Sequence, residues 1–360
     1  MKKIFTVVGA RPQFIKAAAV SRAIRTHFSD QLSEKIIHTG QHFDANMSDV
    51  FFEELDIPKP HRNLEIAGGG HGQMTGRMLE GIETLLIEER PDWVLIYGDT
   101  NSTLAGALAA AKLHIPIAHV EAGLRSYNMG MPEEVNRILS DRISELLFCP
   151  TQTAVDNLAS EGLTKGVHLP GDVMFDVALY YKDKAAREST ALSDLGLTPK
   201  GFVLATCHRA ENTDYPARLT SILGALGRIS KSHPVVLPLH PRTRAFVGKL
   251  GLEALLEDLI TVDPLSFTDM LALEQASAVI VTDSGGVQKE AFFYDVPCIT
   301  MRDETEWVET VNLGWNRIVG ADAERIVTAF EEMVKTSLER PQVSPYGSGD
   351  AAEQIAAKLV

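Results

Sequence analysis

The chain has 360 residues, of which 45% are hydrophobic, 23% charged and 7% aromatic, and its formal net charge is −14. This length predicts about two domains, and the composition is that of a globular protein with enough apolar residues for two cores. The acidic balance excludes a general nucleic-acid binder, because neutralising phosphates requires an excess of Lys and Arg. A small anionic ligand stays possible, since it needs only a local cluster of positive groups.

The first residues, MKKIFTVVGARPQ, indicate a strand and its turn rather than a signal peptide, because the apolar run is short. No apolar run reaches the roughly 18 residues of a membrane helix. The three cysteines, Cys149, Cys207 and Cys298, are far apart and odd in number, so a disulfide framework is not expected. We therefore predict a cytoplasmic protein without membrane insertion.

Short apolar runs alternate with segments of helical period along the whole chain, which predicts parallel sheets covered on both faces by helices. The predicted strands are Lys3–Gly9, Glu34–Thr39, Trp93–Gly98, Ile117–Glu121, Leu146–Cys149, Val167–Leu169, Phe202–Thr206, Val235–Leu239, Ile260–Val262, Ala278–Thr282, Cys298–Met301 and Arg317–Val319. The predicted helices between them are Gln13–Phe28, Gln73–Glu89, Thr103–His114, Thr151–Ser160, Leu219–Lys231, Phe267–Glu274 and Val287–Phe293.

This alternation predicts an α/β protein with two doubly wound, Rossmann-like domains that face a central cleft. We place the domains at residues 1–172 and 173–345, followed by a short amphipathic helix in residues 346–360. In such sheets, ligands bind beyond the carboxyl ends of the strands. Residues directly after the predicted strands are therefore the candidates for a site.

Several common fingerprints are missing from the sequence. No G-x-G-x-x-G follows the first strand, and neither a P-loop nor a G-x-S-x-G elbow is present. His119 and Glu121 match the H-x-E of zinc deaminases, but the P-C-x-x-C half is missing. No His/Cys cluster has the spacing of metal ligands, so we predict no metal. Because the G-x-G-x-x-G is missing, we also predict no nicotinamide cofactor.

The strongest positive signal is AVIVTDSGGVQKEAFF, residues 278–293. An apolar strand ends there, and Ser284, Gly285 and Gly286 open a helix whose N-terminal N–H groups suit a phosphate. Glu290 lies one turn further, where it can accept hydrogen bonds from ribose hydroxyls. The alternative is an ordinary capped helix with glycines chosen for a tight turn.

The segment TCHRAEN, residues 206–212, also follows a predicted strand directly. Because neighbours on a strand point to opposite faces, we assign Cys207 to the core and His208, with Arg209, to the edge of the sheet. LHPRT has the same form and presents His240. A histidine with a purely structural role is the alternative at each position.

The first strand ends in GARPQFIK, residues 9–16, which places Arg11 after the strand and Lys16 in the first helical turns. Both can meet a diphosphate, and the planar guanidinium of Arg suits it best. Solvated surface positions are the alternative for both side chains.

Two acidic residues end neighbouring apolar runs. Asp99 lies in YGDTNSTLAG and Glu121 in HVEAGLR, so the two carboxylates lie close together if their strands are adjacent. Helix capping is the alternative explanation for Asp99.

The stretch SYNMGMPEEVNR leads from Glu121 to a helix start. We predict that Glu133 is a site residue kept ionised by Arg137, and that Glu134 is only an acid of the first helical turn. A surface salt bridge between Glu133 and Arg137, worth about 0.3–0.5 kcal/mol, is the alternative. The loop Ser126–Met131 is a candidate for substrate choice.

Together these segments resemble the non-hydrolysing UDP-N-acetylglucosamine 2-epimerases, in order and over roughly residues 4–320. The resemblance implies a fold of the GT-B glycosyltransferase type, a last helix that packs back on the first domain, no cofactor, a UDP-sugar substrate and a homodimer. The motifs that carry it are GARPQFIK, TGQH, GDTNST, HVEAGLR, MPEEVNR, CPT, GDV, HRAEN, HPRT, TDSGGVQKEA and MRDETE.

The resemblance also implies a mechanism, in which UDP is eliminated to give a 2-acetamidoglucal and is added back after the proton returns to the opposite face of C2. The product would be UDP-N-acetylmannosamine, for surface polysaccharide biosynthesis. Carboxylates for the proton transfer map onto Asp99, Glu121 and Glu133, with Arg137 and His208 nearby. The remaining positions implied by the resemblance are Lys16 in the active site, Glu290 on the ribose and Arg302 among the substrate-binding residues.

Two segments depart from the common family pattern. TEWVE replaces TERPE, so Trp307 stands where a cation is expected, and QHFDANM, residues 41–47, replaces a QHREM-like run associated with a second, activating ligand. With SYNMGMPEE, these changes resemble the branch that acts on UDP-2,3-diacetamido-2,3-dideoxy-glucuronic acid, which is the alternative substrate. A GT-B glycosyltransferase and a non-catalytic nucleotide-sugar sensor are alternatives from other classes.

Overall fold

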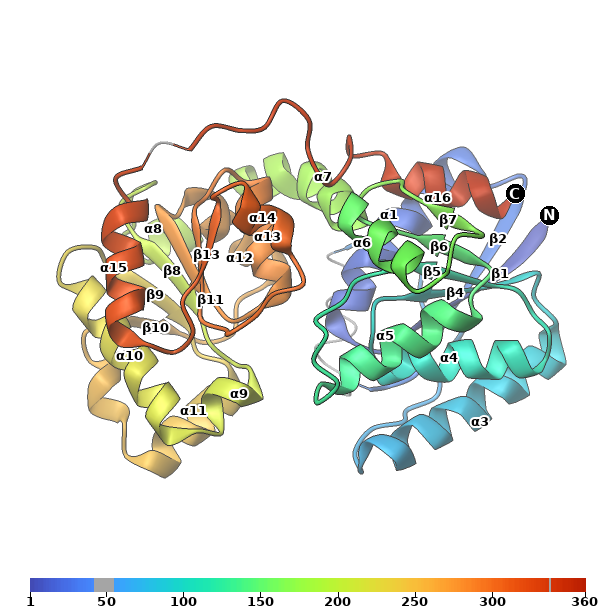
Figure 1. Cartoon of the computed structure of the whole chain (residues 1–360), viewed down its shortest axis with the longest axis horizontal. Coiled ribbons are helices and arrows are strands. Elements are labelled where there is room, and N and C mark those ends of the chain that lie inside the picture. Colours follow the sequence, from blue (N-terminus) through green and yellow to red (C-terminus); the bar gives the residue numbers. More distant parts are fainter. Residues whose placement is uncertain (42–54, 337) are drawn as a thin grey trace. The chain divides into compact units, whose positions relative to one another are not determined.

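A computed structural model describes residues 1–41, 55–336 and 338–360. It divides into two compact units: unit 1 is Met1–Leu179 with Val343–Val360, and unit 2 is Tyr180–Gln342 (Figure 1). Helix α7 (Val173–Glu188) begins in unit 1 and ends in unit 2. Each unit is a parallel sheet with helices on its faces, which confirms the predicted α/β fold class.

The described strands of unit 1 form one seven-stranded sheet in the order β3-β2-β1-β4-β5-β6-β7, with parallel pairs throughout. The six strands predicted for this half are all present. β3 was not predicted, because its two residues are exposed and have no apolar run. The strands are β1 Lys2–Val8, β2 Leu32–His38, β3 Arg62–Asn63, β4 Trp93–Tyr97, β5 Ile117–Val120, β6 Leu146–Phe148 and β7 Val167–His168.

The described strands of unit 2 form a six-stranded parallel sheet in the order β10-β9-β8-β11-β12-β13. All six correspond to predicted strands. They are β8 Val203–Thr206, β9 Val235–Pro238, β10 Ile260–Val262, β11 Val279–Thr282, β12 Cys298–Thr300 and β13 Asn316–Ile318.

Helices connect the strands, as parallel pairing requires. In unit 1 they are α1 Arg11–His27, α3 His71–Glu89, α4 Asn101–Lys112, α5 Pro132–Ile143, α6 Gln152–Ser160 and α16 Ala351–Leu359. In unit 2 they are α8 Ala191–Asp194, α9 Ala210–Thr213, α10 Pro216–Ser230, α11 Pro241–Leu250, the 3₁₀ helix η1 Glu253–Leu256, α12 Phe267–Ala276, α13 Gly285–Phe293, α14 Val308–Asn312 and α15 Ala323–Met333.

The strand order of each sheet reverses once, and this point determines where a ligand can bind. In unit 1 the chain leaves β1 toward β2 and returns to β4 on the other side of β1. In unit 2 it leaves β8 toward β9 and returns to β11 on the other side of β8. The segments that follow β1, β4, β8 and β11 carry most of the predicted site residues.

The last helix, α16, packs on α1 and starts at a carboxylate of α7. Asp176 accepts hydrogen bonds from the backbone N–H groups of Ala351, at 3.3 Å, and Ala352, at 2.7 Å. Burial, with Asp172 and Asp350 nearby, raises the pKa of Asp176 to about 6, although the two N–H bonds oppose the shift. Asp176 therefore connects α16 to α7 within unit 1.

This raised pKa predicts a pH-dependent stability. A carboxyl with a higher pKa in the folded chain binds its proton more tightly there, so its stabilising effect is complete below about pH 4 and is lost as pH rises through about 6. The change is at most about 3 kcal/mol. We expect the melting temperature of the wild type to fall relative to that of Asp176→Asn between these values. Parallel curves would contradict this assignment.

Candidate functional site

The turn after β1 is fixed by a buried glutamine. The Gln13 side chain accepts hydrogen bonds from the N–H groups of Gly9, at 2.8 Å, and Ala10, at 3.1 Å. It donates to the carbonyl of Tyr97, at 2.9 Å, at the end of β4. Gln13 thus joins the two strands at the switch point of unit 1, and Arg11 opens α1 beside it.

Lys16 and Glu121 form a largely buried ion pair at this edge. Glu121 has a φ of +70°, a left-handed conformation that is costly for a residue with a side chain. Gly98, at φ +60°, lies against the pair: a Cβ there would be 3.2 Å from Lys16 Nζ and 3.4 Å from Glu121 Oε1. The structure thus brings together two predicted site residues from distant parts of the chain.

Asp99 is held by α5. The Arg137 guanidinium, itself buried, donates to the Asp99 carboxylate and, at 2.8 Å, to Glu134 Oε2. Asn136 donates to the Asp99 carbonyl at 2.9 Å. Because β4 and β5 pair directly, Asp99 and Glu121 follow neighbouring strands, as predicted.

Two predictions for the glutamates of α5 were wrong, namely the pairing of Arg137 with Glu133 and the role of Glu134 as only an acid of the first turn. Arg137 pairs with Glu134 three residues away, and no ion pair joins it to Glu133 among the described residues. Glu134 is 1% exposed and also accepts from the backbone N–H groups of Ser126, at 3.0 Å, and Tyr127, at 2.9 Å. Glu134, Arg137 and Asp141 share the buried face of the helix, whereas Glu133 lies half-buried beside it. Glu134 therefore anchors the loop Ser126–Met131.

Behind the acidic residues lies a buried network centred on Asp141. Its carboxylate accepts hydrogen bonds from His119 Nδ1 at 2.8 Å, Arg125 Nη1 at 2.7 Å and the Gly123 N–H at 3.1 Å. Arg125 also donates to Glu161 at 2.6 Å and 2.8 Å. Burial alone would raise the pKa of Asp141, but His119 and Arg125 lower it below its usual value. No motif in the sequence pointed to this network, because its members come from distant parts of the chain.

In unit 2 a buried aspartate joins two of the predicted motifs. Asp283, which follows β11, accepts from the backbone N–H groups of His208, at 3.1 and 3.0 Å, and Arg209, at 3.0 Å. Asn212 donates to the same carboxylate at 3.1 Å. The His208 ring is partly exposed, and its centroid lies 5.3 Å from that of His240. Three predicted site residues thus lie at the edge where β8, β9 and β11 end: His208, Arg209 and His240.

The segment after Asp283 opens helix α13. Ser284 is the N-cap residue, with its N–H bonded to Thr282 Oγ1 at 2.9 Å, and Gly285 and Gly286 form the first turn. Glu290 lies one turn further and is 8% exposed. The order strand, Asp-Ser, glycines, helix is the one predicted from the sequence.

Trp307 packs against this helix and carries a buried lysine on its ring. Lys289 is 1% exposed, and its Nζ lies 3.8 Å from the centroid of Trp307. The indole Nε1 lies 3.4 Å from the position that a Cβ of Gly285 would take. Thr305 fixes the segment by donating to Gln288 at 2.7 Å. Trp307, which departs from the family pattern, therefore contacts the buried Lys289 of α13 with its ring.

The lysine–tryptophan contact predicts a stability effect. Replacing Trp307 by leucine removes the ring from a buried ammonium, a contact worth about 2 kcal/mol when desolvated. We expect chemical denaturation to show a loss of at least that size, and a smaller loss when Lys289 is already methionine. An equal loss of unfolding free energy with lysine and with methionine at position 289 would mean that the Trp307 ring contributes only by filling volume.

Arg302, which was predicted among the substrate-binding residues, pairs with two carboxylates of unit 2. Its side chain is fully buried and donates to Glu211 at 3.1 Å and to Glu306 at 3.0 Å. A guanidinium covered on all sides supports the edge from below, and the substrate contact of Arg302 stays a prediction. Burial would lower the pKa of Arg302, but the two carboxylates raise it, which keeps the arginine charged beneath the edge.

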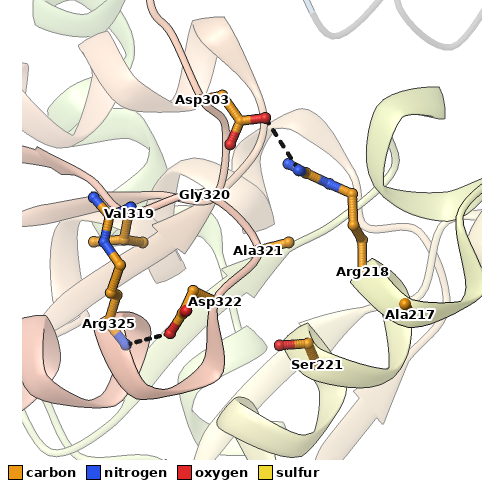
Figure 2. A pocket seen from close by; sticks show the side chains of 9 residues that line it. All are labelled: Ala217, Arg218, Ser221, Asp303, Val319, Gly320, Ala321, Asp322 and Arg325. Atoms are coloured by element: carbon orange, nitrogen blue, oxygen red, sulfur yellow. Dashed lines mark hydrogen bonds and ion pairs between the residues drawn. The ribbon is translucent and has the colours of Figure 1, made fainter.

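A separate hollow of about 380 Å³ lies in unit 2 and is lined by none of the predicted site residues (Figure 2). Arg218 points across it to Asp303, at 3.0 Å, and Asp322 accepts from the N–H of Arg325, at 2.9 Å. Two arginines and two aspartates balance in charge there. The lining residues are Ala217, Arg218, Ser221, Asp303, Val319, Gly320, Ala321, Asp322 and Arg325.

The described residues contain no group of three or more His, Cys, Asp or Glu side chains placed to hold a metal ion. Within the same residues, no helix has the length and apolar character of a membrane span. The QHFDANM segment, residues 41–47, lies almost entirely outside the described residues.

The two doubly wound units define a protein of the GT-B class. A glycosyltransferase from Rickettsia africae, with a TM-score of 0.55 and 13% identity, shares this fold. The structure is more similar to that of the Methanocaldococcus jannaschii UDP-GlcNAc 2-epimerase solved with UDP-GlcNAc and UDP. The TM-score is 0.92, the sequence identity is 39%, and 99% of each chain is covered.

The UDP-N-acetylglucosamine 2-epimerase family model matches residues 25–360. The chain is 56% identical to the UDP-2,3-diacetamido-2,3-dideoxy-D-glucuronate 2-epimerase of Pseudomonas aeruginosa, over 99% of both chains. It is 42% identical to a UDP-N-acetylglucosamine 2-epimerase of Methanococcus maripaludis, over 99% of this chain and 97% of the other. The chain belongs to the UDP-N-acetylglucosamine 2-epimerase family.

Proposed function

We propose that this protein inverts C2 of UDP-2,3-diacetamido-2,3-dideoxy-D-glucuronate. The observation that carries the choice of sugar is the 56% identity to a relative named for that reaction, over 99% of both chains. The segments TEWVE and SYNMGMPEE, which resemble the branch that acts on this sugar, agree with the choice.

In this proposal the edge of unit 2 binds UDP. The N-terminal turn of α13, at Ser284–Gly286, takes the diphosphate, and Arg209, His208 and His240 add donors. Glu290 accepts from the ribose, and Arg302 acts from below by holding Glu211 and Glu306. Arg11, at the start of α1, stays a predicted ligand of the diphosphate.

The chemistry falls to unit 1. One carboxylate removes the proton from C2 while the C1–O bond breaks and its electron pair leaves with UDP, giving a C1–C2 double bond. UDP oxygen then attacks C1, and a proton is delivered to the opposite face of C2. Asp99, Glu121 and Glu133 are the proposed acids and bases, and Lys16 balances the charge on Glu121.

The assignment of the sugar is tested by incubating the pure protein separately with the diacetamido-glucuronate nucleotide and with UDP-N-acetylglucosamine, and following C2 inversion by proton NMR. We expect the first to be epimerised with the larger kcat/KM. A larger kcat/KM for UDP-N-acetylglucosamine would overturn the choice of sugar but not the reaction class. Transfer to an added acceptor, without any epimer, would instead support a glycosyltransferase.

UDP-N-acetylglucosamine is the second candidate, and the fold match supports it. The M. jannaschii enzyme solved with that nucleotide aligns with a TM-score of 0.92. Three properties stay predictions: the homodimer, the cytoplasmic location and the role in polysaccharide synthesis. Light scattering of the purified protein tests the homodimer.

A further inference from the structure

His119 is the first residue of the HVEAG segment and is fully buried on β5, two residues before Glu121. Its ring has a hydrogen-bond partner at each nitrogen. Nδ1 lies 2.8 Å from Asp141 Oδ1, and Nε2 lies 2.7 Å from the carbonyl oxygen of Gly98.

Both partners are acceptors. A backbone carbonyl has no proton to give. Asp141 is ionised, because it also accepts from the Arg125 guanidinium and from the Gly123 N–H. Neutral imidazole has one N–H and one lone pair, so it can satisfy only one of these contacts. Two donated hydrogen bonds require the imidazolium form.

The surrounding charges permit a buried cation here. His119 and Arg125 contribute two positive charges, and Asp141 and Glu161 contribute two negative ones. The neighbouring Cys149 thiol stays neutral, since burial and Asp141 raise its pKa. A buried charge is tolerated when it is paired and hydrogen-bonded on all sides.

The second hydrogen bond reaches the proposed site. Gly98 has a left-handed backbone, lies against the Lys16–Glu121 pair and directly precedes Asp99. By bonding the Gly98 carbonyl, the His119 ring joins the end of β4 to the end of β5, where Glu121 is also left-handed.

We propose that His119 is a positioning residue whose two ring nitrogens both donate hydrogen bonds, and that it holds Gly98 and thereby sets the placement of Asp99 and Glu121. It touches no substrate and transfers no proton. The proposal rests on the proposed function only for the identity of the reacting carboxylates.

Nitrogen NMR of the histidine-labelled protein tests the protonation state directly, with His119→Asn identifying the resonances. We expect both ring nitrogens of His119 to be protonated at near-neutral pH, because both face acceptors. A resonance in the range of an unprotonated ring nitrogen at near-neutral pH would overturn the proposal, whatever the activity of the variants.

His119→Asn tests the positioning role, because asparagine can keep a bond to Asp141 but lacks the ring nitrogen that donates to the Gly98 carbonyl. We expect kcat to fall about 10–100-fold through small displacements of the carboxylates, with KM and UDP affinity nearly unchanged. Unchanged kcat in a folded His119→Asn protein would refute positioning by the ring. Wild-type protein that failed to bind UDP would contradict the proposed function and not this inference.

Discussion

Glu121→Gln is expected to lower kcat by about 10³-fold, because glutamine keeps the shape of the side chain but cannot take or give a proton at C2. The affinity for UDP should change less than about threefold, since Glu121 is not among the proposed nucleotide ligands. The two readouts are the rate of C2 inversion followed by NMR and the heat of UDP binding. Glu88→Gln, which removes an exposed carboxylate from α3, is the matched control for loss of one negative charge.

Full activity of Glu121→Gln would mean that the strained Lys16–Glu121 pair is structural. A loss of activity accompanied by an equal loss of UDP affinity would also argue against a role in proton transfer. Loss of kcat alone is the result that our assignment requires.

The adjacent pair Glu133→Gln and Glu134→Gln is expected to give opposite results. Glu133 is half-buried, so its substitution should leave the free energy of unfolding nearly unchanged and lower kcat about 10²-fold. Glu134 is buried and accepts from Arg137, Ser126 and Tyr127, so its substitution should cost about 2–4 kcal/mol of stability. Denaturation and turnover are measured on both variants.

The two variants control for each other, because each replaces one glutamate of the same helical turn. Equal loss of stability in both would show that Glu133 shares the buried network. A stable Glu134→Gln protein with an unchanged loop would contradict the anchoring role that we assign to Glu134.

The fold was predictable because each strand of these sheets is a continuous apolar run, and parallel sheets bury both faces. The end of each run then marked Asp99, Glu121, His208 and Ser284 as edge residues. β3 was not predictable, since two exposed residues carry no such signal.

The positioning residues were harder to predict, because their roles depend on partners far away in the chain. Glu133 and Glu134 are equivalent in sequence, and only the rotation of α5 decides which one faces Arg137. No feature of the sequence showed that Asp283 holds the backbone of His208. Lys289 could not be singled out from the sequence, because its role depends on the contact with the Trp307 ring.

The central claim is that this chain epimerises a UDP-sugar by removing and replacing the proton at C2. The most direct measurement is the deuterium content at C2 of the product sugar, by NMR or mass spectrometry, after reaction in deuterated water. We predict one solvent deuteron at C2 of each product molecule formed. Product with inverted C2 that has kept its original hydrogen would contradict the account.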